Sequence, residues 1–350
     1  MRRLFIENIQ QIYNLLQDDL SKEIFTKRLM YSLTDDSRYI REIICLSEIG
    51  NTIHQKLKNT NKNKVIFGSG EIGQKIHSFF NDIKFECFVD NKHYGKICNG
   101  LSVIDINTLK TNYSDALIII STAKYSEEIF NQLLQEGFKK ENIINIGNEY
   151  KKQNHLQYFD LPVLKSSVNK KEIFVDGGCY DALNACEFKK WCENSGGVEE
   201  LFVYAWEPDP QSKNVCKEKL DIHQIQYTLI NKGLWSSKDT LHFESDKKSS
   251  AISKNGTITI EVDSIDNIIN QPVTYIKLDV EGSEYEALLG AEGTIKKYKP
   301  KLAVCVYHKS EDIWELPLLI HKFNPDYKFY LRHYSFADNE TVLYAIDSNN

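Results

Sequence analysis

From residue 64 onward, short apolar runs alternate with longer amphipathic stretches. Runs such as 65–67, 116–120, 173–175 and 201–206 are typical of buried strands. The segments between them place apolar residues three and four positions apart, which predicts helices. Strands that alternate with helices indicate parallel sheets covered by helices. The pattern therefore predicts an α/β protein.

The alternation occurs twice, and this divides the chain into four predicted parts. Residues 1–60 show helical periodicity without strand-like runs and are predicted to be a helical N-terminal segment. Residues 64–147 predict a small Rossmann-like α/β domain. Residues 148–170 are rich in Lys, Gln and Asn and predict a linker. Residues 171–350 predict a second, larger α/β domain, in keeping with the two domains that a length of 350 residues favours.

Composition narrows the function classes. The net charge of −6 provides no basic surface for nucleic acid. No apolar run approaches the roughly 18 residues of a membrane span, and the N-terminus lacks the apolar core of a signal peptide. The eight cysteines form no C-x-x-C pair, so buried, reduced thiols are expected. We expect a cytoplasmic protein without nucleic-acid partners. Its oligomeric state is open, with a homo-oligomer as one option.

The strongest candidate site lies at two strand ends about thirty residues apart. The run 173–175 leads into Asp176, Gly177 and Gly178, and the run 201–206 leads into Glu207. A carboxylate at the end of the second strand is where α/β sheets bind ribose hydroxyls, next to a glycine turn that lets a ligand approach. The third glycine of the dinucleotide fingerprint is missing. The pattern therefore favours an adenosyl group that carries something smaller than a pyrophosphate.

Two further strand ends are predicted to meet the first pair. The run 274–279 ends in Asp279, with Glu281 and Glu284 following, and the run 302–307 ends next to His308. The carboxyl ends of parallel strands lie at one edge of a sheet, where ligands bind. Carboxylates that end buried strands must be paired or liganded. These residues therefore predict one composite site.

Residues 172–346 resemble the FkbM-type S-adenosylmethionine-dependent methyltransferases. The resemblance is carried by Val175-Asp-Gly-Gly, Trp206-Glu-Pro-Asp-Pro, Gly233-Leu-Trp, Ile276-Lys-Leu-Asp-Val-Glu-Gly-Ser-Glu, and Gly290-Ala-Glu with Lys299-Pro-Lys. It implies a class I (Rossmann-like) methyltransferase sheet and S-adenosylmethionine as cofactor. Family members methylate hydroxyls, often on sugars. The resemblance thus implies an O-methyltransferase acting on a nucleotide-linked or glycan-bound sugar in polysaccharide biosynthesis.

The resemblance also implies roles for particular residues. Asp176, Gly177 and Gly178 would face the methionine part of the cofactor, and Glu207 would bind the ribose. Tyr180 and Pro208 would be further cofactor contacts, and Trp206 or Trp235 would flank the adenine. Asp279 would contact the cofactor as well and lie near the methyl acceptor. The general base would come from Asp279, Glu281, His308 and His333.

Among these bases His308 is preferred, because a neutral imidazole titrates near working pH. No metal ion is favoured. If one is bound, Asp279 and Glu281 are the expected ligands. Substrate choice is expected to depend on loops such as 246–256. One position departs from the family pattern, because Ala182 stands where a glycine is common.

A second glycine loop precedes the first. Gly68, Gly70 and Gly73 lie between a predicted strand and a predicted helix, and Asp90 follows 22 residues after Gly68. The loop is either a nucleotide site at a helix N-terminus or a structural turn. One alternative function follows from the first reading, a nicotinamide-dependent sugar-modifying oxidoreductase that uses this loop. A second alternative for the protein is a non-catalytic nucleotide-binding module that keeps the fold.

Overall fold

The computed structural model describes residues 2–154, 157–165, 168–246, 249–252 and 258–347. The chain forms two compact units, each assembled from separate stretches of sequence. The large unit comprises stretches within 1–22, 158–332 and 341–350, and the small unit comprises 23–157 and 333–340. Residues of the predicted helical segment 1–60 are thus shared between the units.

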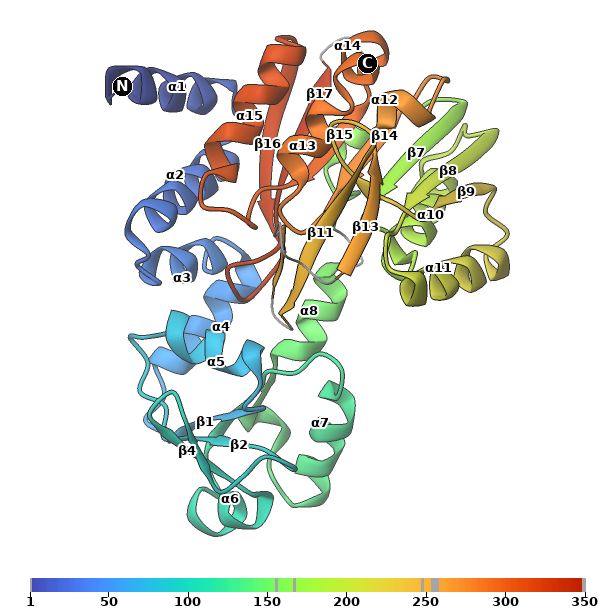
Figure 1. Ribbon diagram of the computed structural model, residues 1–350. Coiled ribbons are helices and arrows are strands. Elements are labelled where there is room, and N and C mark those ends of the chain that lie inside the picture. The colour runs from blue at the N-terminus through green and yellow to red at the C-terminus, as the bar shows by residue number, and fades with distance from the viewer. Residues whose placement is uncertain (1, 155–156, 166–167, 247–248, 253–257, 348–350) are drawn as a thin grey trace. The chain divides into compact units, whose positions relative to one another are not determined.

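The large unit is built on a seven-stranded sheet, coloured green to red in Figure 1. Its strand order is β16-β17-β15-β14-β7-β8-β9. Strands β7, β8, β9, β14 and β15 pair in parallel, and β17 is antiparallel to β15. The strands are β7 (Lys171–Gly177), β8 (Glu200–Trp206), β9 (Tyr227–Ile230), β14 (Tyr275–Leu278), β15 (Lys301–Cys305), β16 (Tyr327–His333) and β17 (Thr341–Asp347).

The order of this sheet reverses between β7 and β14. From β7 the chain proceeds outward through β8 and β9, and it then returns to place β14 and β15 on the other side of β7. Such a reversal opens a crevice beyond the carboxyl ends of the two central strands. The predicted α/β class is confirmed, and the reversal lies where Asp176 and Asp279 end their strands.

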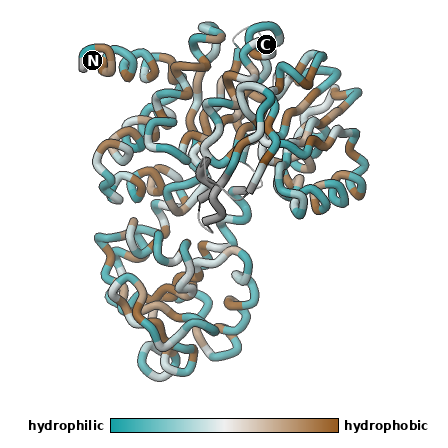
Figure 2. Tube along the Cα trace, viewed as in Figure 1, coloured by the Kyte–Doolittle hydropathy of each residue, from teal (hydrophilic) through white to brown (hydrophobic). Residues whose placement is uncertain are grey.

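Helices and aromatic packing complete the large unit. Phe159 packs against the rings of Phe174 and Phe188, and Phe174 stacks on Phe188 at 4.4 Å between centroids. Figure 2 shows hydrophobic residues concentrated along the strands and alternating with polar ones along the helices. The helices are α1 (Arg2–Leu15), α9 (Pro162–Lys165), α10 (Leu183–Ser195), α11 (Pro210–Ile222), α12 (Ile265–Ile268), α13 (Glu284–Leu289), α14 (Glu292–Tyr298) and α15 (Asp312–Phe323).

A second sheet is inserted between β9 and β14, with strand order β10-β13-β11-β12. Its strands are β10 (Gly233–Leu234), β11 (Asp239–Asp246), β12 (Ser249–Ile252) and β13 (Ile258–Asp263). The loop expected at 246–256 falls partly here. Residues 249–252 form β12, and residues 247–248 and 253–257 lie outside the described residues.

The small unit has a six-stranded sheet of order β3-β4-β2-β1-β5-β6. All four residues of β5 are buried, as its continuous apolar run predicts. The strands are β1 (Lys64–Phe67), β2 (Cys87–Val89), β3 (Lys96–Cys98), β4 (Leu101–Ile104), β5 (Leu117–Ile120) and β6 (Ile143–Asn145). Its helices are α3 (Arg38–Ile44), α4 (Glu48–Lys58), α5 (Glu71–Phe79), α6 (Ile106–Asn112), α7 (Ser126–Gln135), η1 (Lys140–Asn142) and α8 (Ile146–Asn154), while α2 (Asp19–Thr34) begins in the large unit.

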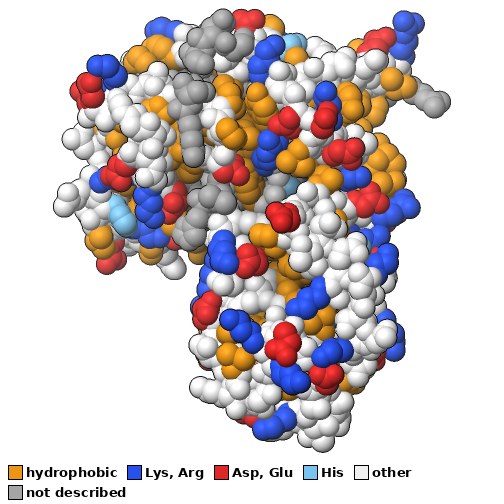
Figure 3. Space-filling model, turned by 180° about the vertical axis from the view of Figure 1, so that it is seen from behind, with side chains coloured by type: hydrophobic (Ala, Val, Ile, Leu, Met, Phe, Trp, Pro, Cys, Tyr) orange, Lys and Arg blue, Asp and Glu red, His pale blue; other side chains and the backbone are white. Residues whose placement is uncertain are grey.

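The surface carries charges of both signs. On the face shown in Figure 3, acidic and basic side chains are interspersed and do not gather by sign. Among the helices of the described ranges, none combines the length and the apolar character that crossing a lipid bilayer requires.

Candidate active site

The glycine turn after β7 is shaped by its contact with the chain after β14. Gly178 has a φ of +76°, and a Cβ added there would lie 1.9 Å from the carbonyl oxygen of Asp279. A Cβ on Gly177 would lie 2.6 Å from Leu234 Cδ1. Both glycines are therefore required by packing within the protein, whatever binds outside the turn.

A buried ion pair holds this turn. The Nζ of Lys277 lies 3.2 Å from Oδ1 of Asp176, and both side chains are completely buried. The same Nζ donates to the carbonyl oxygens of Gly177, at 3.1 Å, and Gly178, at 2.8 Å. Burial acts to lower the pKa of Lys277, but the carboxylates of Asp176 and Asp279 outweigh it and hold that pKa above its ordinary value. Asp176 thus acts on the turn through Lys277 and is too buried to contact a ligand.

Glu207 ties the glycine turn to the start of α11. Its Oε2 accepts from the backbone N–H of Tyr180, and its Oε1 accepts from that of Asp209, both at 2.8 Å. Burial raises the pKa of Glu207, although these two N–H groups oppose the shift. Each carboxylate oxygen can accept more than one hydrogen bond, so acceptor capacity remains for a diol.

The predicted aromatic contacts have different environments. Tyr180 is 71% exposed, and its backbone N–H is one of the two that donate to Glu207. Trp206 is only 1% exposed and belongs to the core, whereas Trp235 is half-buried. Ala182 adopts a left-handed conformation with φ of +59° just before α10, which explains why a glycine suits this position.

Asp279 lies at the centre of a polar cluster formed by Asp279, Glu281, Glu284, Tyr307 and His308, called here the Asp279 cluster. Its Oδ2 accepts from the hydroxyl of Tyr158 at 3.1 Å. Its Oδ1 accepts from the hydroxyl of Tyr307 at 3.2 Å and lies 3.6 Å from His308 Nε2. Asp279 is therefore oriented by groups from two separate segments of the chain, one with Tyr158 and one with Tyr307 and His308.

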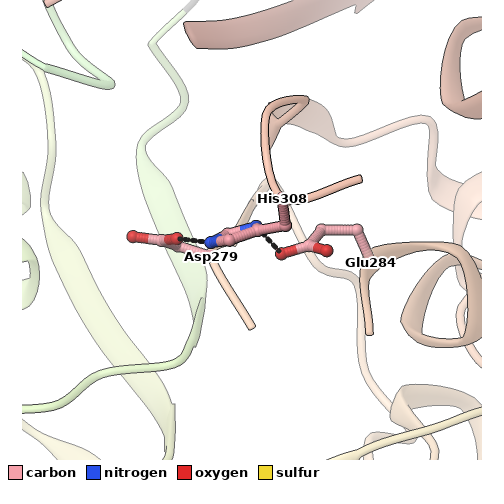
Figure 4. Close-up of side chains that lie close together, drawn as sticks. All are labelled: Asp279, Glu284 and His308. Carbon is pink, nitrogen blue, oxygen red and sulfur yellow. Dashed lines mark ion pairs between the residues drawn. The ribbon is translucent and has the colours of Figure 1, made fainter. Parts of the chain in front are cut away.

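His308 is enclosed by carboxylates (Figure 4). Its Nδ1 lies 2.9 Å from Glu284 Oε1, and its Nε2 lies 3.7 Å from Glu281 Oε2. Burial acts to lower the pKa of His308, but Glu284, followed by Asp279 and Glu281, raises it to about 9. The imidazole is therefore charged near neutral pH. The sequence predicts a neutral His308 at working pH. This expectation is wrong for this arrangement, because the carboxylates of Asp279, Glu281 and Glu284 surround the imidazole.

Buried acids continue behind the cluster. Glu284 is completely buried and also accepts from the backbone N–H of Val280 at 2.9 Å. Burial raises the pKa of Asp312 to about 7, and the neighbouring Glu284 contributes. The positive charge of His308 balances part of this negative charge.

The two expected metal ligands, Asp279 and Glu281, do not belong to one group of candidate ligand atoms in the described residues. Single atoms of Asp279, Glu284 and His308 lie within 4.8 Å of one another, which is the spacing a metal ion needs. Glu281, the expected partner of Asp279, is not a member of this group, and its side chain is 83% exposed.

His333 is assigned to a different compact unit from the other candidates for the general base. It belongs to the small unit, whereas Asp279 and His308 belong to the large unit. Burial, followed by the nearby charge of Arg28, lowers the pKa of His333 to about 3. Its imidazole is therefore neutral over the whole physiological pH range.

The N-terminal glycine loop, which contains Gly68, Gly70 and Gly73, is held by hydrogen bonds within the loop and to Asp90. The carboxylate of Asp90 accepts from the N–H and the hydroxyl of Ser69 and from the backbone N–H groups of Lys92 and His93, at 2.9–3.2 Å. Burial opposes its ionisation, but these bonds lower the pKa of Asp90 to about 2. A Cβ on Gly73 would lie 2.0 Å from the carbonyl oxygen of Gly68, while one on Gly70 would meet no atom within 4 Å. The acid of the possible nucleotide site is thus engaged in holding the turn.

Three residues of the site carried no predicted role. Lys277 had a sequence signal, since a charged residue stands inside the apolar run of β14. Glu284 was named in its motif but not as a partner of His308. Tyr158 lies in the predicted linker and had no signal, because only the folded chain brings it to Asp279.

Comparisons with known proteins match two parts of the chain to family models. The family model of the methyltransferase FkbM domain matches residues 176–336, and that of the C2185-like N-terminal domain matches residues 60–144. A search of curated proteins finds no match. The solved methyltransferase FkbM from Methylobacillus flagellatus shares 18% identity and a TM-score of 0.50, over 92% of this chain and 98% of that chain.

Two other solved structures match a smaller share of the chain. An rRNA methylase from Streptococcus thermophilus shares 13% identity over 56% of this chain and 94% of its own, with a TM-score of 0.34. An O-methyltransferase from Bacillus cereus in complex with SAH shares 7% identity over 69% of this chain and 96% of its own, also with a TM-score of 0.34.

The FkbM model begins at Asp176 and spans Glu207 and the whole Asp279 cluster, so the matched segment coincides with the site described above. Among the predicted enzyme classes, this match selects methyl transfer over nicotinamide chemistry. Residues 176–336 match the FkbM methyltransferase family, and the chain is therefore an S-adenosylmethionine-dependent methyltransferase.

Proposed function

We propose that this enzyme transfers a methyl group to a hydroxyl of a sugar, carried on a nucleotide or within a glycan, in the cytoplasm. The observation that supports this most is the polar rim of the Asp279 cluster. Glu281 is exposed and lies 3.7 Å from His308, and Tyr307 donates to Asp279 in the same cluster, so carboxylate, imidazole and phenol groups are available to an acceptor. Such a set suits a molecule with several hydroxyls, because each hydroxyl both donates and accepts.

The cofactor half of the site fits an adenosyl sulfonium compound. Glu207 retains acceptor capacity for a ribose diol at the end of β8. The carbonyl groups of Gly177 and Gly178 are fixed by Lys277, and Tyr180 is exposed next to them. When bound, S-adenosylmethionine supplies an electrophilic methyl group.

The acceptor half has two tasks, alignment and removal of a proton. Displacement at a methyl carbon requires the acceptor oxygen in line with the leaving group, so a fixed orientation contributes much of the rate. Each carboxylate oxygen of Asp279 accepts one hydrogen bond from a tyrosine and can accept another. Asp279 takes the proton of the acceptor hydroxyl as the new C–O bond forms. The charged His308 stabilises the carboxylate that performs this step.

The test is methyl transfer from labelled S-adenosylmethionine to a panel of nucleotide sugars and oligosaccharides. For the variant Asp279→Asn we expect kcat to fall about 100-fold or more, the range of general-base catalysis. Binding of S-adenosylhomocysteine, measured by calorimetry, should change little. Asp326→Asn, an exposed site on the same unit, is the matched control and should retain activity.

Two outcomes contradict the proposal. Label recovered in nucleic acid or protein, with none in any sugar, would exclude the acceptor class. Full activity of Asp279→Asn would exclude the role of that carboxylate.

A further inference from the structure

Tyr158 has an unusual backbone conformation for its position. It lies in the segment 148–170, which composition predicts to be a linker, yet it is only 2% exposed. Its φ is +75°, a left-handed value that is rare for a bulky residue. A conformation of this kind persists only where the surrounding structure holds it, and such residues concentrate at functional sites.

Two tyrosines of the central sheet hold this conformation. The backbone N–H of Tyr158 donates to the hydroxyl of Tyr344 in β17 at 3.0 Å. Its carbonyl oxygen accepts from the hydroxyl of Tyr275 in β14. Both partners are completely buried, so the peptide groups on either side of Tyr158 are anchored in the core.

The side chain of Tyr158 contacts Asp279 and Lys277, the two residues that organise the site. Its hydroxyl donates to Oδ2 of Asp279 at 3.1 Å, and it also lies 3.5 Å from Cys305 Sγ. The ring faces Lys277, whose Nζ is 5.5 Å from the ring centroid. Lys277 in turn holds the glycine turn through its carbonyl groups.

We propose that Tyr158 is a positioning residue for methyl transfer, which fixes the plane of the Asp279 carboxylate against the acceptor hydroxyl. This inference rests on the proposed role of Asp279. The hydroxyls of Tyr158 and Tyr307 hold opposite oxygens of the carboxylate, so neither oxygen can rotate without losing a donor. Removing the Tyr158 hydroxyl leaves one donor and a carboxylate free to turn.

The first test compares Tyr158→Phe with Tyr327→Phe. Tyr327 is a matched control, because it is equally buried and its hydroxyl donates to the carbonyl oxygen of Pro300. We expect Tyr158→Phe to lower kcat about tenfold, the loss typical of one hydrogen bond to a charged group, with the KM for S-adenosylmethionine nearly unchanged. Tyr327→Phe should lose stability but keep kcat.

A second readout does not depend on the acceptor. His308 faces Asp279, Glu281, Glu284 and, behind them, Asp312, and its titration can be followed by NMR of labelled histidine. In Tyr158→Phe, the freed carboxylate is expected to turn toward the nearest cation, His308 Nε2. The titration midpoint of His308 should therefore rise, and in Tyr327→Phe it should stay in place.

The two readouts separate the possible failures. If the wild-type protein methylates no sugar, the proposed function fails, while the His308 titration still tests the role of Tyr158. A folded Tyr158→Phe variant with wild-type kcat overturns the inference. A midpoint of His308 that stays or falls in that variant overturns it as well.

Discussion

At the scale of single residues, the charge on His308 is decided by its neighbours. Glu284 contacts one ring nitrogen, and Asp279 and Glu281 lie near the other. The folded state therefore binds a proton that the unfolded chain releases at lower pH. A group whose pKa rises on folding stabilises the protein below its unfolded pKa, and this contribution disappears as the pH rises through the folded value.

The pH dependence of stability tests this charge. The pKa of His308 is raised from 6.5 to about 9, so His308→Gln should cost up to about 3 kcal/mol of unfolding free energy below pH 6.5. The difference from wild type should shrink between pH 6.5 and 9 and be small above that. Denaturant unfolding at several pH values measures it.

The control for this experiment is His223→Gln, an exposed histidine at the end of α11. Its effect on the unfolding free energy should be small. A loss in His308→Gln that is equally large at pH 6 and pH 10 would show that packing, and not charge, is what the histidine contributes.

At the scale of elements, the junction of β7 and β14 depends on the absence of a side chain at Gly178. A Cβ there would meet the carbonyl oxygen of Asp279, which is backbone and cannot move aside without moving β14. The same junction holds Lys277 against Asp176, so a local clash would spread into the buried ion pair.

Gly178→Ala and Gly196→Ala separate the clash from backbone strain. Both glycines have positive φ, +76° and +72°, but a Cβ on Gly196 would meet no atom within 4 Å. Gly196→Ala should cost about 1–3 kcal/mol of unfolding free energy, the strain of a positive-φ conformation that glycine alone adopts easily. Gly178→Ala should cost clearly more and abolish binding of S-adenosylhomocysteine. Equal losses in thermal or denaturant unfolding would contradict the packing role.

At the scale of the whole molecule, the methyltransferase unit is not one continuous stretch of chain. Gln17 donates its backbone N–H to the carbonyl oxygen of Phe329, and the buried Ser21 accepts from the N–H of Leu331 at 2.8 Å. Residues before the small unit therefore cover β16, a strand at the edge of the large sheet. Covering such an edge protects its free backbone groups.

Truncation tests this division. The fragment 171–350, which the sequence pattern predicts as a domain, lacks Tyr158, Phe159 and the first 22 residues. It should be less soluble and unfold at lower temperature than the whole chain, because Phe159 packs on Phe174, Phe188, Trp191 and Tyr275. A fragment with the melting temperature of the intact protein, measured by calorimetry, would show that these contacts contribute little.

The sequence by itself determined the fold class and predicted where the candidate site lies. Apolar runs mark the strands, and the polar residues that end them, Asp176, Glu207, Asp279 and His308, mark one edge of a parallel sheet. This works because strand burial and strand ends are local properties, visible in a few consecutive residues. The family motifs at the same positions indicate the cofactor and the type of reaction.

Only the tertiary structure decided how these residues are paired. It buried Asp176 against Lys277. It placed Glu284, and not Glu281, next to Nδ1 of His308. It engaged Asp90 in hydrogen bonds within its own turn. It also brought Tyr158 to Asp279 across 121 positions of sequence. Such contacts join segments that are distant in the chain. The charge and the exposure of a side chain depend on these neighbours, and no local pattern of sequence contains them.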